Sequence, residues 1–439
     1  MLERIFKLKA HGTALRTEVL AGLTTFLTMA YIVLVNPTIL ADAGMPVAAA
    51  AAATCLAAAF GSIMMGLVAN YPIALAPGMG LNAYFTYTVV QGMGLPWQTA
   101  LGCVFLSGLA FMLLTVAGIR QMIVQAIPRD LFAAIAGGIG LFIAFIGLRS
   151  AGIVVSNPAT TVALGDLTTP AAGLTVFGLV ITGVLLAWRI RAAMLVGILA
   201  TTILAWVLGV VDWKPAPYSF EALTATAFKL DVPAAIGIGG EGLTLALIEI
   251  LFVFLFVDLF DNVGTLVAVT KRAGLVDKDG DIPRLNRVLV TDSTATMVGA
   301  VAGTTTTVSY IESAAGVAAG GRTGLTAVVV GLLFLLAMFF APFAQAIPAA
   351  ATAPALILVG AMMMAPLVES DWTDPMVAIP GFLTLAAIPL TFSIANGLAF
   401  GIIAYAVLRL ARGQARWADW LLYVLAALFV VRFVWLAAG

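Results

Sequence analysis

Charged residues are scarce in this sequence. Lys, Arg, Asp and Glu together make up 10% of the 439 residues, whereas hydrophobic residues make up 62%. Roughly a quarter of the residues in a soluble domain are charged, so the few charges here cannot cover the surface of a globule of this length. The composition therefore excludes a soluble enzyme, a disordered protein and a secreted disulfide scaffold.

Cysteine and histidine are scarcer still. Cys55 and Cys103 both lie inside apolar stretches, where a free cysteine behaves as a small core residue. The single histidine, His11, lies in the N-terminal tail. The 21 basic and 21 acidic residues balance, which leaves no basic excess to attract nucleic acid. We therefore expect neither a disulfide framework nor a nucleic-acid partner.

Motifs of energy-coupled and hydrolytic enzymes are also missing. The chain has no Walker loop, HExxH sequence or nucleophile elbow, so nothing indicates an ATP-driven engine. The acidic run at 277–281 resembles a calcium loop in composition only, because its spacing is wrong and no Glu closes it. We interpret it as a cytoplasmic turn. The sequence thus predicts no enzyme, no cofactor and no metal site.

Long apolar runs dominate the chain instead. A helix of about 20 apolar residues crosses the hydrocarbon core, and the first run, 19–40, is too long to be the apolar part of a signal peptide. The predicted crossings are 19–40, 47–69, 72–90, 97–118, 131–148, 172–188, 192–211, 243–268, 285–302, 304–320, 323–347, 351–368, 376–393 and 394–408. A further run at 417–438 is rich in aromatic residues, so it could span the membrane or lie at its interface. The pattern predicts an all-α polytopic membrane protein with fourteen segments.

The positive charges predict the orientation. With the N-terminus in the cytoplasm, most Lys and Arg residues fall in cytoplasmic loops, as the positive-inside rule requires. The loops on the outer side then hold Arg149, Lys214 and Lys229. Omitting one early crossing would remove the excess of Lys and Arg on the cytoplasmic side, so the interrupted runs 72–90 and 304–320 both count as crossings. We expect a multi-pass protein of the inner (cytoplasmic) membrane with a cytoplasmic N-terminus.

The chain divides into two halves with similar interruptions. The longest polar interval, 212–242, separates seven segments from seven, and an odd number gives the halves inverted topology. Pro72 and Pro77 interrupt the third segment. The run 303–310 is β-branched and extended by propensity, and it precedes a capping-box pattern that ends at Glu312. Each half thus offers a short strand that leads into a half-helix, in segments 3 and 10.

Acidic residues inside these segments are the main candidates for function. An Asp at the centre of a membrane helix costs about 2.5–3.5 kcal/mol. Asp258, Asp261 and Thr265 are spaced so that they share one helical face, which must look at a cavity or at other helices. Glu312 lies on the second half-helix and Asp292 within 285–302. A gapless offset of 233 residues between the halves pairs Thr28 with Asp261 and Met79 with Glu312.

Structural roles are the alternative for each candidate. Glu312 could serve only as a capping-box acid, and Asp258 or Asp292 could bond a neighbouring helix. Asn82, on the first half-helix, could be a packing residue. A structural role explains Asp261 least well, because it shares the polar face of its helix and pairs with a polar residue under the repeat offset.

Four stretches resemble the nucleobase:cation symporter-2 family, in its AzgA-like branch of adenine, guanine and hypoxanthine permeases. They are GLTTFLTMAYIVLVNP at 22–37, APGMGLNAYF at 76–85, FVDLFDNVGT at 256–265 and SYIESAAGV at 309–317. The resemblance implies two inverted repeats of seven segments, a core domain of segments 1–4 and 8–11, and a gate domain of segments 5–7 and 12–14. The implied parts are a cytoplasmic tail 1–18, the core 19–118 and 243–347, the gate 119–211 and 348–411, an extracytoplasmic loop 212–242 and a C-terminal apolar segment 412–439.

The resemblance also implies the residues of a site between the strands of segments 3 and 10. The family's segment-8 acid falls on Asp261, its segment-10 acid on Glu312, its segment-9 acid on Asp292 and the branch's segment-3 asparagine on Asn82. The uracil branch has a histidine one turn after the segment-8 acid, where this chain has Thr265. The xanthine/urate signature near segment 10 is also absent, and both departures argue against uracil, xanthine and urate.

We therefore predict a secondary active transporter that imports purine nucleobases by proton symport with an elevator-like movement. The predicted substrate-binding residues are Asp261, Glu312, Asn82, Thr28, Tyr310, Met79 and Ile311. The predicted proton-coupling residues are Asp261, Glu312, Asp258 and Asp292. Sodium stays open as the coupling ion, and so does the choice between a monomer and a homodimer. The alternatives are an anion transporter of the same fold, an intramembrane aspartyl protease and a passive channel.

Overall fold

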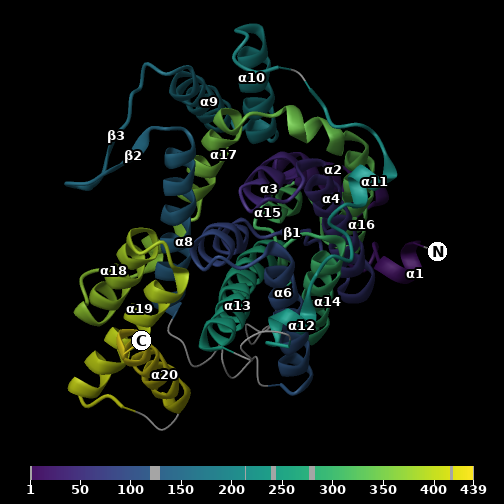
Figure 1. Cartoon of the computed structure of the whole chain (residues 1–439). Coiled ribbons are helices and arrows are strands. Elements are labelled where there is room, and N and C mark those ends of the chain that lie inside the picture. Colours follow the sequence, from purple (N-terminus) through teal and green to yellow (C-terminus); the bar gives the residue numbers. More distant parts are fainter. Residues whose placement is uncertain are drawn as a thin grey trace. The chain divides into compact units, whose positions relative to one another are not determined.

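The computed structural model describes residues 2–118, 129–212, 214–238, 244–275, 282–415 and 419–438 (Figure 1). The first half contains α1 (Leu2–Phe6), α2 (Leu15–Met29), α3 (Ile32–Ala41), α4 (Val47–Met64), η1 (Met65–Ala69), β1 (Leu75–Pro77), α5 (Met79–Ala83), η2 (Tyr84–Gly92), α6 (Trp97–Val116), α8 (Arg129–Ser150), β2 (Val154–Asn157), β3 (Thr161–Leu164), α9 (Pro170–Ala187) and α10 (Ala193–Val207). The second half contains α11 (Phe220–Thr224), α12 (Val232–Ala235), α13 (Leu245–Ala273), α14 (Leu285–Ala302), β4 (Thr307–Ser309), α15 (Ser313–Ala318), α16 (Gly324–Ala337), η3 (Met338–Ala346), α17 (Ala349–Met362), η4 (Ala365–Glu369), α18 (Pro375–Leu390), α19 (Ile394–Ala411) and α20 (Trp420–Ala438).

The predicted membrane segments are confirmed. Among the described residues, eight apolar helices are long enough to cross a membrane: Leu15–Ala41, Val47–Ala69, Trp97–Val116, Asp130–Ser150, Pro170–Ala187, Gly324–Ala346, Ala349–Glu369 and Ile394–Ala411. Segments 7 and 13 are the shorter apolar helices α10 and α18. Segments 8 and 9 are α13 and α14, which carry the acidic candidates, and segments 3 and 10 are the two strand–half-helix units. The fold is therefore the expected helical membrane bundle of seven plus seven segments.

Contacts between loops agree with this number of crossings. The Tyr87 hydroxyl at the end of segment 3 donates to Asp42 after segment 1, at 2.7 Å. The Tyr71 hydroxyl after segment 2 donates to the carbonyl oxygen of Pro283 after segment 8, at 2.5 Å. If successive segments cross the membrane in alternating directions, the two regions that each pair joins lie on the same side of the membrane. The predicted turn at 277–281, Arg120 and Arg416 lie outside the described residues.

One compact unit comprises Met1–Val116 and Gly147–Leu356. Small residues set its packing, since α4 is rich in alanine and lies against α3, α14 and α16. A Cβ on Gly324 of α16 would overlap the carbonyl oxygen of Gly66 in η1. Lipid tails are as apolar as side chains, so membrane helices associate through such close backbone packing rather than through hydrophobic exclusion.

A two-stranded sheet joins the halves within this unit. β1 and β4 pair antiparallel, with Ala76 opposite Val308 at the centre. Ser62 of α4 clamps β1, because its hydroxyl donates to the carbonyl oxygen of Leu75 and accepts from its N–H. Thr296 of α14 clamps β4 in the same way through the N–H and carbonyl of Thr307. The two halves thus hold their strands with equivalent hydroxyl groups.

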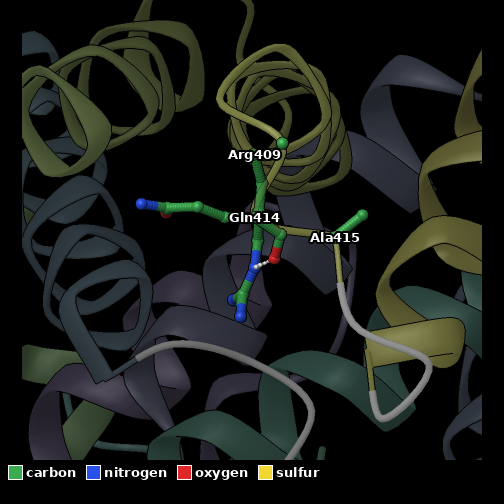
Figure 2. A pocket seen from close by; sticks show the side chains of 4 residues that line it. Arg409, Gln414 and Ala415 are labelled. Atoms are coloured by element: carbon green, nitrogen blue, oxygen red, sulfur yellow. Dashed lines mark hydrogen bonds between the residues drawn. The ribbon is translucent and has the colours of Figure 1, made fainter.

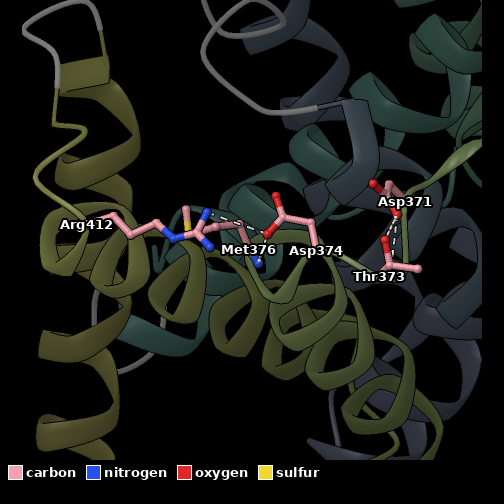
Figure 3. A network of polar contacts seen from close by, with 5 residues as sticks. All are labelled: Asp371, Thr373, Asp374, Met376 and Arg412. Atoms are coloured by element: carbon pink, nitrogen blue, oxygen red, sulfur yellow. Dashed lines mark hydrogen bonds and ion pairs between the residues drawn. The ribbon is translucent and has the colours of Figure 1, made fainter.

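The second compact unit comprises Ala117–Ile146 and Ile357–Gly439. α8 and α17 meet at Gly140 and Gly360, where a Cβ on either residue would crowd the carbonyl oxygen of the other. This self-complementary contact is what two equivalent segments of an inverted repeat produce. The start of α18 lies beside the end of α19. Asp374 caps α18, and its Oδ1 lies 3.6 Å from Nη1 of Arg412, directly after α19 (Figure 3).

The helix pairs of segments 6–7 and 13–14 repeat one packing detail. In the α9–α10 pair, a Cβ on Gly197 would overlap the Thr182 hydroxyl. In the α18–α19 pair, a Cβ on Gly401 would overlap the Thr384 hydroxyl. The same residue types meet at the same place in both pairs, so α9 and α10 correspond to α18 and α19, and α20 lies beyond the repeat.

The C-terminal run forms α20, which runs antiparallel to α19. Arg409 near the end of α19 pairs with Asp419 at 2.9 Å, and Arg432 donates to the Asn396 side chain at the start of α19, at 3.0 Å. α20 is therefore tied to α19 at both ends.

Two loops contain structure that the sequence did not predict. The loop after α8 forms the hairpin β2–β3, with Val154 opposite Leu164. The described part of the predicted loop 212–242 contains α11 and α12, and the Asp231 N–H donates to the carbonyl oxygen of Gln98 at 2.9 Å.

Candidate functional site

The β1–β4 sheet brings two half-helices together. α5 begins at Met79, two residues after β1 ends, and α15 begins at Ser313, four residues after β4 ends. The Gly78 N–H donates to the carbonyl oxygen of Thr306 and the Tyr310 N–H to that of Ala74, both at 2.9 Å. Both half-helices therefore start from one hydrogen-bonded unit inside the bundle, the β1–β4 sheet.

Glu312 lies at the start of the second half-helix. Its side chain makes no capping hydrogen bond to α15, so the capping-box interpretation of this residue is wrong. Its Oε1 instead accepts a hydrogen bond from the Tyr31 hydroxyl at 2.7 Å. Glu312 is partly exposed, whereas Tyr31 is buried. The carboxylate is thus held through one oxygen by a buried hydroxyl, in a residue that is itself not fully buried.

Asp261 reaches the start of the first half-helix from α13. Its Oδ2 lies 3.7 Å from the position that a Cβ on Gly78 would take, directly before α5. Glu312 and Asp292 lie close enough to act electrostatically on its carboxyl group. The structure therefore brings three of the four predicted proton-coupling acids into one neighbourhood.

Burial separates the four acids into two pairs. Asp261 and Glu312 are partly exposed, whereas Asp258 and Asp292 expose 2% and 0% of their surface. Asp258 lies one turn before Asp261 on the same face of α13. Direct contact with a ligand is therefore open to Asp261 and Glu312 and closed to the other two in this conformation.

Asn82 lies in a buried polar cluster. Its amide donates to the side-chain oxygen of Asn36, and the Asn36 amide donates to Thr54 at 2.7 Å and to Thr304 at 3.0 Å. Among the described residues the side-chain oxygen of Asn82 has no hydrogen-bond partner. The cluster joins segments 1, 2, 3 and 10, and it leaves one acceptor of Asn82 available.

The remaining predicted residues lie near the β1–β4 sheet and the two half-helices. The Tyr310 hydroxyl donates to the carbonyl oxygen of Pro77 at 2.5 Å, so this buried residue braces β1. Met79 is buried at the start of α5, and Ile311 is 49% exposed beside Glu312. The Thr28 hydroxyl donates to the carbonyl oxygen of Thr25 at 2.7 Å, and its oxygen can still accept.

Four buried polar residues received no role from the sequence. Tyr31 and Asn36 lie inside the first apolar run, and Asn262 follows Asp261. Asn262 is fully buried, and neither atom of its amide has a hydrogen-bond partner in the described part of the chain. Glu18, fully buried, accepts from the Thr326 hydroxyl at 2.6 Å. The feature of the sequence that could have identified these residues is the presence of a polar side chain within or beside an apolar run.

Other features of the described residues do not form a second site of this kind. The pocket at the end of α19 is lined by Arg409, Gly413, Gln414 and Ala415, and the Arg409 Nε donates to the Gln414 carbonyl oxygen at its wall (Figure 2). The described residues contain no group of three His, Cys, Asp or Glu side chains that could hold a metal ion.

Comparison with known proteins identifies the family. A model of the permease family matches residues 16–400. The chain belongs to the nucleobase:cation symporter-2 family of permeases. Adenine permease AdeP of Escherichia coli (strain K12) is 45% identical over 438 residues, which cover 100% of this chain and 97% of that protein. Guanine/hypoxanthine permease PbuG of Bacillus subtilis (strain 168) is 43% identical over 455 residues, covering 99% of this chain and 100% of that protein.

A solved structure shares the fold of this permease. The transmembrane domain of the cyanobacterial bicarbonate transporter BicA superposes with a TM-score of 0.66 at 16% sequence identity, covering 88% of this chain and 97% of that one. At this identity the likeness concerns the fold alone. The predicted family and fold are therefore confirmed, and the chain is a multi-pass membrane protein of a permease family.

Proposed function

We propose that this permease imports a purine base, adenine, guanine or hypoxanthine, and that Asp261 and Glu312 bind it between the half-helices. The observation that carries the proposal is the pair of partly exposed carboxylates at the two half-helices: Asp261 lies beside Gly78, directly before α5, and Glu312 lies directly before α15. Relatives named as purine permeases over their full length support the substrate class.

The chemistry of a purine fits these groups. A purine presents ring and exocyclic N–H donors and ring-nitrogen acceptors in one plane. Carboxylate oxygens accept from N–H groups, while the first N–H groups of the helical run that begins at Met79 are free to donate. Thr28 and Ile311 are the further contacts that we propose, whereas Asn82, like Asp258 and Asp292, is buried and makes no direct contact in this conformation.

Proton coupling follows from the repulsion between the acids. Two carboxylates that share a site of low dielectric disfavour their doubly ionised state. One proton on Asp261 or Glu312 relieves this repulsion when the base binds, and the buried Asp258 and Asp292 adjust the local field. A loaded, neutral site then crosses the membrane more easily than an empty, charged one.

An elevator-like movement of the core (19–118 and 243–347) against the gate (119–211 and 348–411) is the proposed transport step. The Arg191 guanidinium, in the proposed gate, donates to the Thr24 hydroxyl of the proposed core at 2.7 Å. This contact between α2 and the turn before α10 has to break and re-form in each cycle. The proposed setting is the cytoplasmic membrane with a cytoplasmic N-terminus, as the distribution of Lys and Arg indicates.

The alternatives fit the site less well. An anion would meet the negative charges of Asp261 and Glu312, so the shared fold with a bicarbonate transporter does not extend to its cargo. A pair of proteolytic aspartates must flank one peptide bond, whereas Asp258 and Asp261 lie one turn apart on one helix and Asp258 is buried.

Uptake of radiolabelled bases into cells without their own purine permeases tests the proposal. One proton moving through 100 mV supplies about 2.3 kcal/mol, enough for about 50-fold accumulation. We expect accumulation that a protonophore abolishes, and its loss in Asp261→Asn and Glu312→Gln. Equal accumulation by both variants would contradict the proposed site, and accumulation that follows a sodium gradient would contradict the coupling ion.

A further inference from the structure

The second half-helix and the turn that follows it are attached to segment 1. Beyond the end of α15, the carboxylate of the buried Glu18 accepts from the Arg322 N–H of this turn at 2.9 Å and from the Thr326 hydroxyl of α16 at 2.6 Å. In the middle, Gly316 lies so close to α2 that a Cβ would sit 2.7 Å from the Ala21 carbonyl oxygen. At the near end, the Tyr31 hydroxyl donates to Glu312. α15 therefore runs antiparallel to α2 and its first residue cannot shift freely.

Tyr31 occupies the break between two helices of segment 1. α2 ends at Met29 and α3 begins at Ile32, and the Tyr31 ring is 1% exposed. The packed ring fixes where its hydroxyl points, and that hydroxyl lies 2.7 Å from Glu312 Oε1. A hydrogen bond to a carboxylate is about twice as strong as one between neutral groups, so this contact restricts the rotation of the carboxylate.

We propose that Tyr31 is a positioning residue for purine recognition: it occupies one oxygen of Glu312 and turns the other toward the base. This inference rests on the proposed function. A freely rotating carboxylate accepts from N–H groups in many directions, whereas a fixed one matches an N–H donor at one place. Tyr31 thus sets the affinity and the discrimination between bases that carry an N–H at that place and bases that do not.

A structural tyrosine would behave differently. Tyr71 provides the matched control, because it is also fully buried and its hydroxyl donates to the Pro283 carbonyl oxygen at 2.5 Å. Tyr71→Phe removes a buried hydroxyl whose hydrogen bond to Pro283 joins the loops after segments 2 and 8. Loss of folded protein lowers the maximal uptake rate but leaves KM and the ranking of competing bases unchanged, so these two quantities separate positioning from folding.

The test measures uptake of radiolabelled adenine, guanine and hypoxanthine by wild type, Tyr31→Phe and Tyr71→Phe, with the 7-methyl and 9-methyl forms of each base as competitors. Loss of one charge-assisted hydrogen bond corresponds to about a tenfold change in affinity. We expect Tyr31→Phe to raise KM about tenfold and to lower the discrimination against a methylated base by a similar factor. Tyr71→Phe should leave both quantities within twofold of wild type.

The outcomes are separable. A KM and a competition ranking for Tyr31→Phe within twofold of wild type would overturn the positioning role while leaving the proposed function intact. Equal changes in Tyr31→Phe and Tyr71→Phe would also overturn it, because a general structural effect would then suffice. Absence of uptake and of competition by any purine in wild type would overturn both proposals.

Discussion

The two half-helices of this permease start from equivalent frames but carry different chemistry. Ser62 clamps the strand before α5, and Thr296 clamps the strand before α15 in the same way. However, α15 brings its own acid, Glu312, and receives the Tyr31 hydroxyl from segment 1. α5 brings no acid, and Asp261 of segment 8 reaches its start instead. The inverted repeat thus makes the two backbones alike, whereas the different side chains at the starts of α5 and α15 make the site asymmetric.

The largest effect that distinguishes the two half-helices concerns their glycines. In Gly316→Ala the new Cβ meets the backbone of Ala21, which cannot move aside, whereas in Gly78→Ala it meets the end of the Val308 side chain at 2.9 Å. Overpacking typically costs about 1–3 kcal/mol, so we expect Gly316→Ala to lose thermal stability in detergent and Gly78→Ala to lose less.

Gly183→Ala on α9 is the control for this comparison. A Cβ there meets nothing within 4 Å, and alanine is favoured over glycine inside a helix by about 1 kcal/mol. The control should therefore be as stable as wild type or more stable. Equal melting temperatures for Gly316→Ala and Gly183→Ala would contradict the close packing of α15 on α2.

A smaller effect tests whether the two frames are equivalent. Ser62→Ala and Thr296→Ala each leave the N–H and carbonyl of one buried strand residue without this partner, at a cost of about 1–3 kcal/mol. We expect the two variants to lose similar stability in thermal unfolding and to keep the wild-type ranking of purines. A loss confined to one variant would show that the strands are held differently.

The membrane segments could be predicted because hydrocarbon thickness sets the length of an apolar run. The broken segments were predictable as well, since Pro72, Pro77 and the threonine run at 304–307 interrupt the helical pattern. Asp261 and Glu312 stood out because charge inside a membrane helix is costly. Each of these predictions rests on a physical penalty that acts locally along the chain.

Partners that depend on tertiary packing could not be predicted. A tyrosine in an apolar run carries no penalty that marks it, so nothing linked Tyr31 to a glutamate 281 positions away. Ser309 and Glu312 match a capping box, yet Glu312 bonds a distant hydroxyl instead. The attachment of α20 to α19 through Arg409 and Arg432 likewise appears only in three dimensions.

A structure of the permease with a purine base bound tests the proposed site most directly. We predict that the base lies between α5 and α15, with N–H groups within hydrogen-bonding distance of both the Asp261 and Glu312 carboxylates. A base bound elsewhere, or one that contacts neither carboxylate, would contradict it.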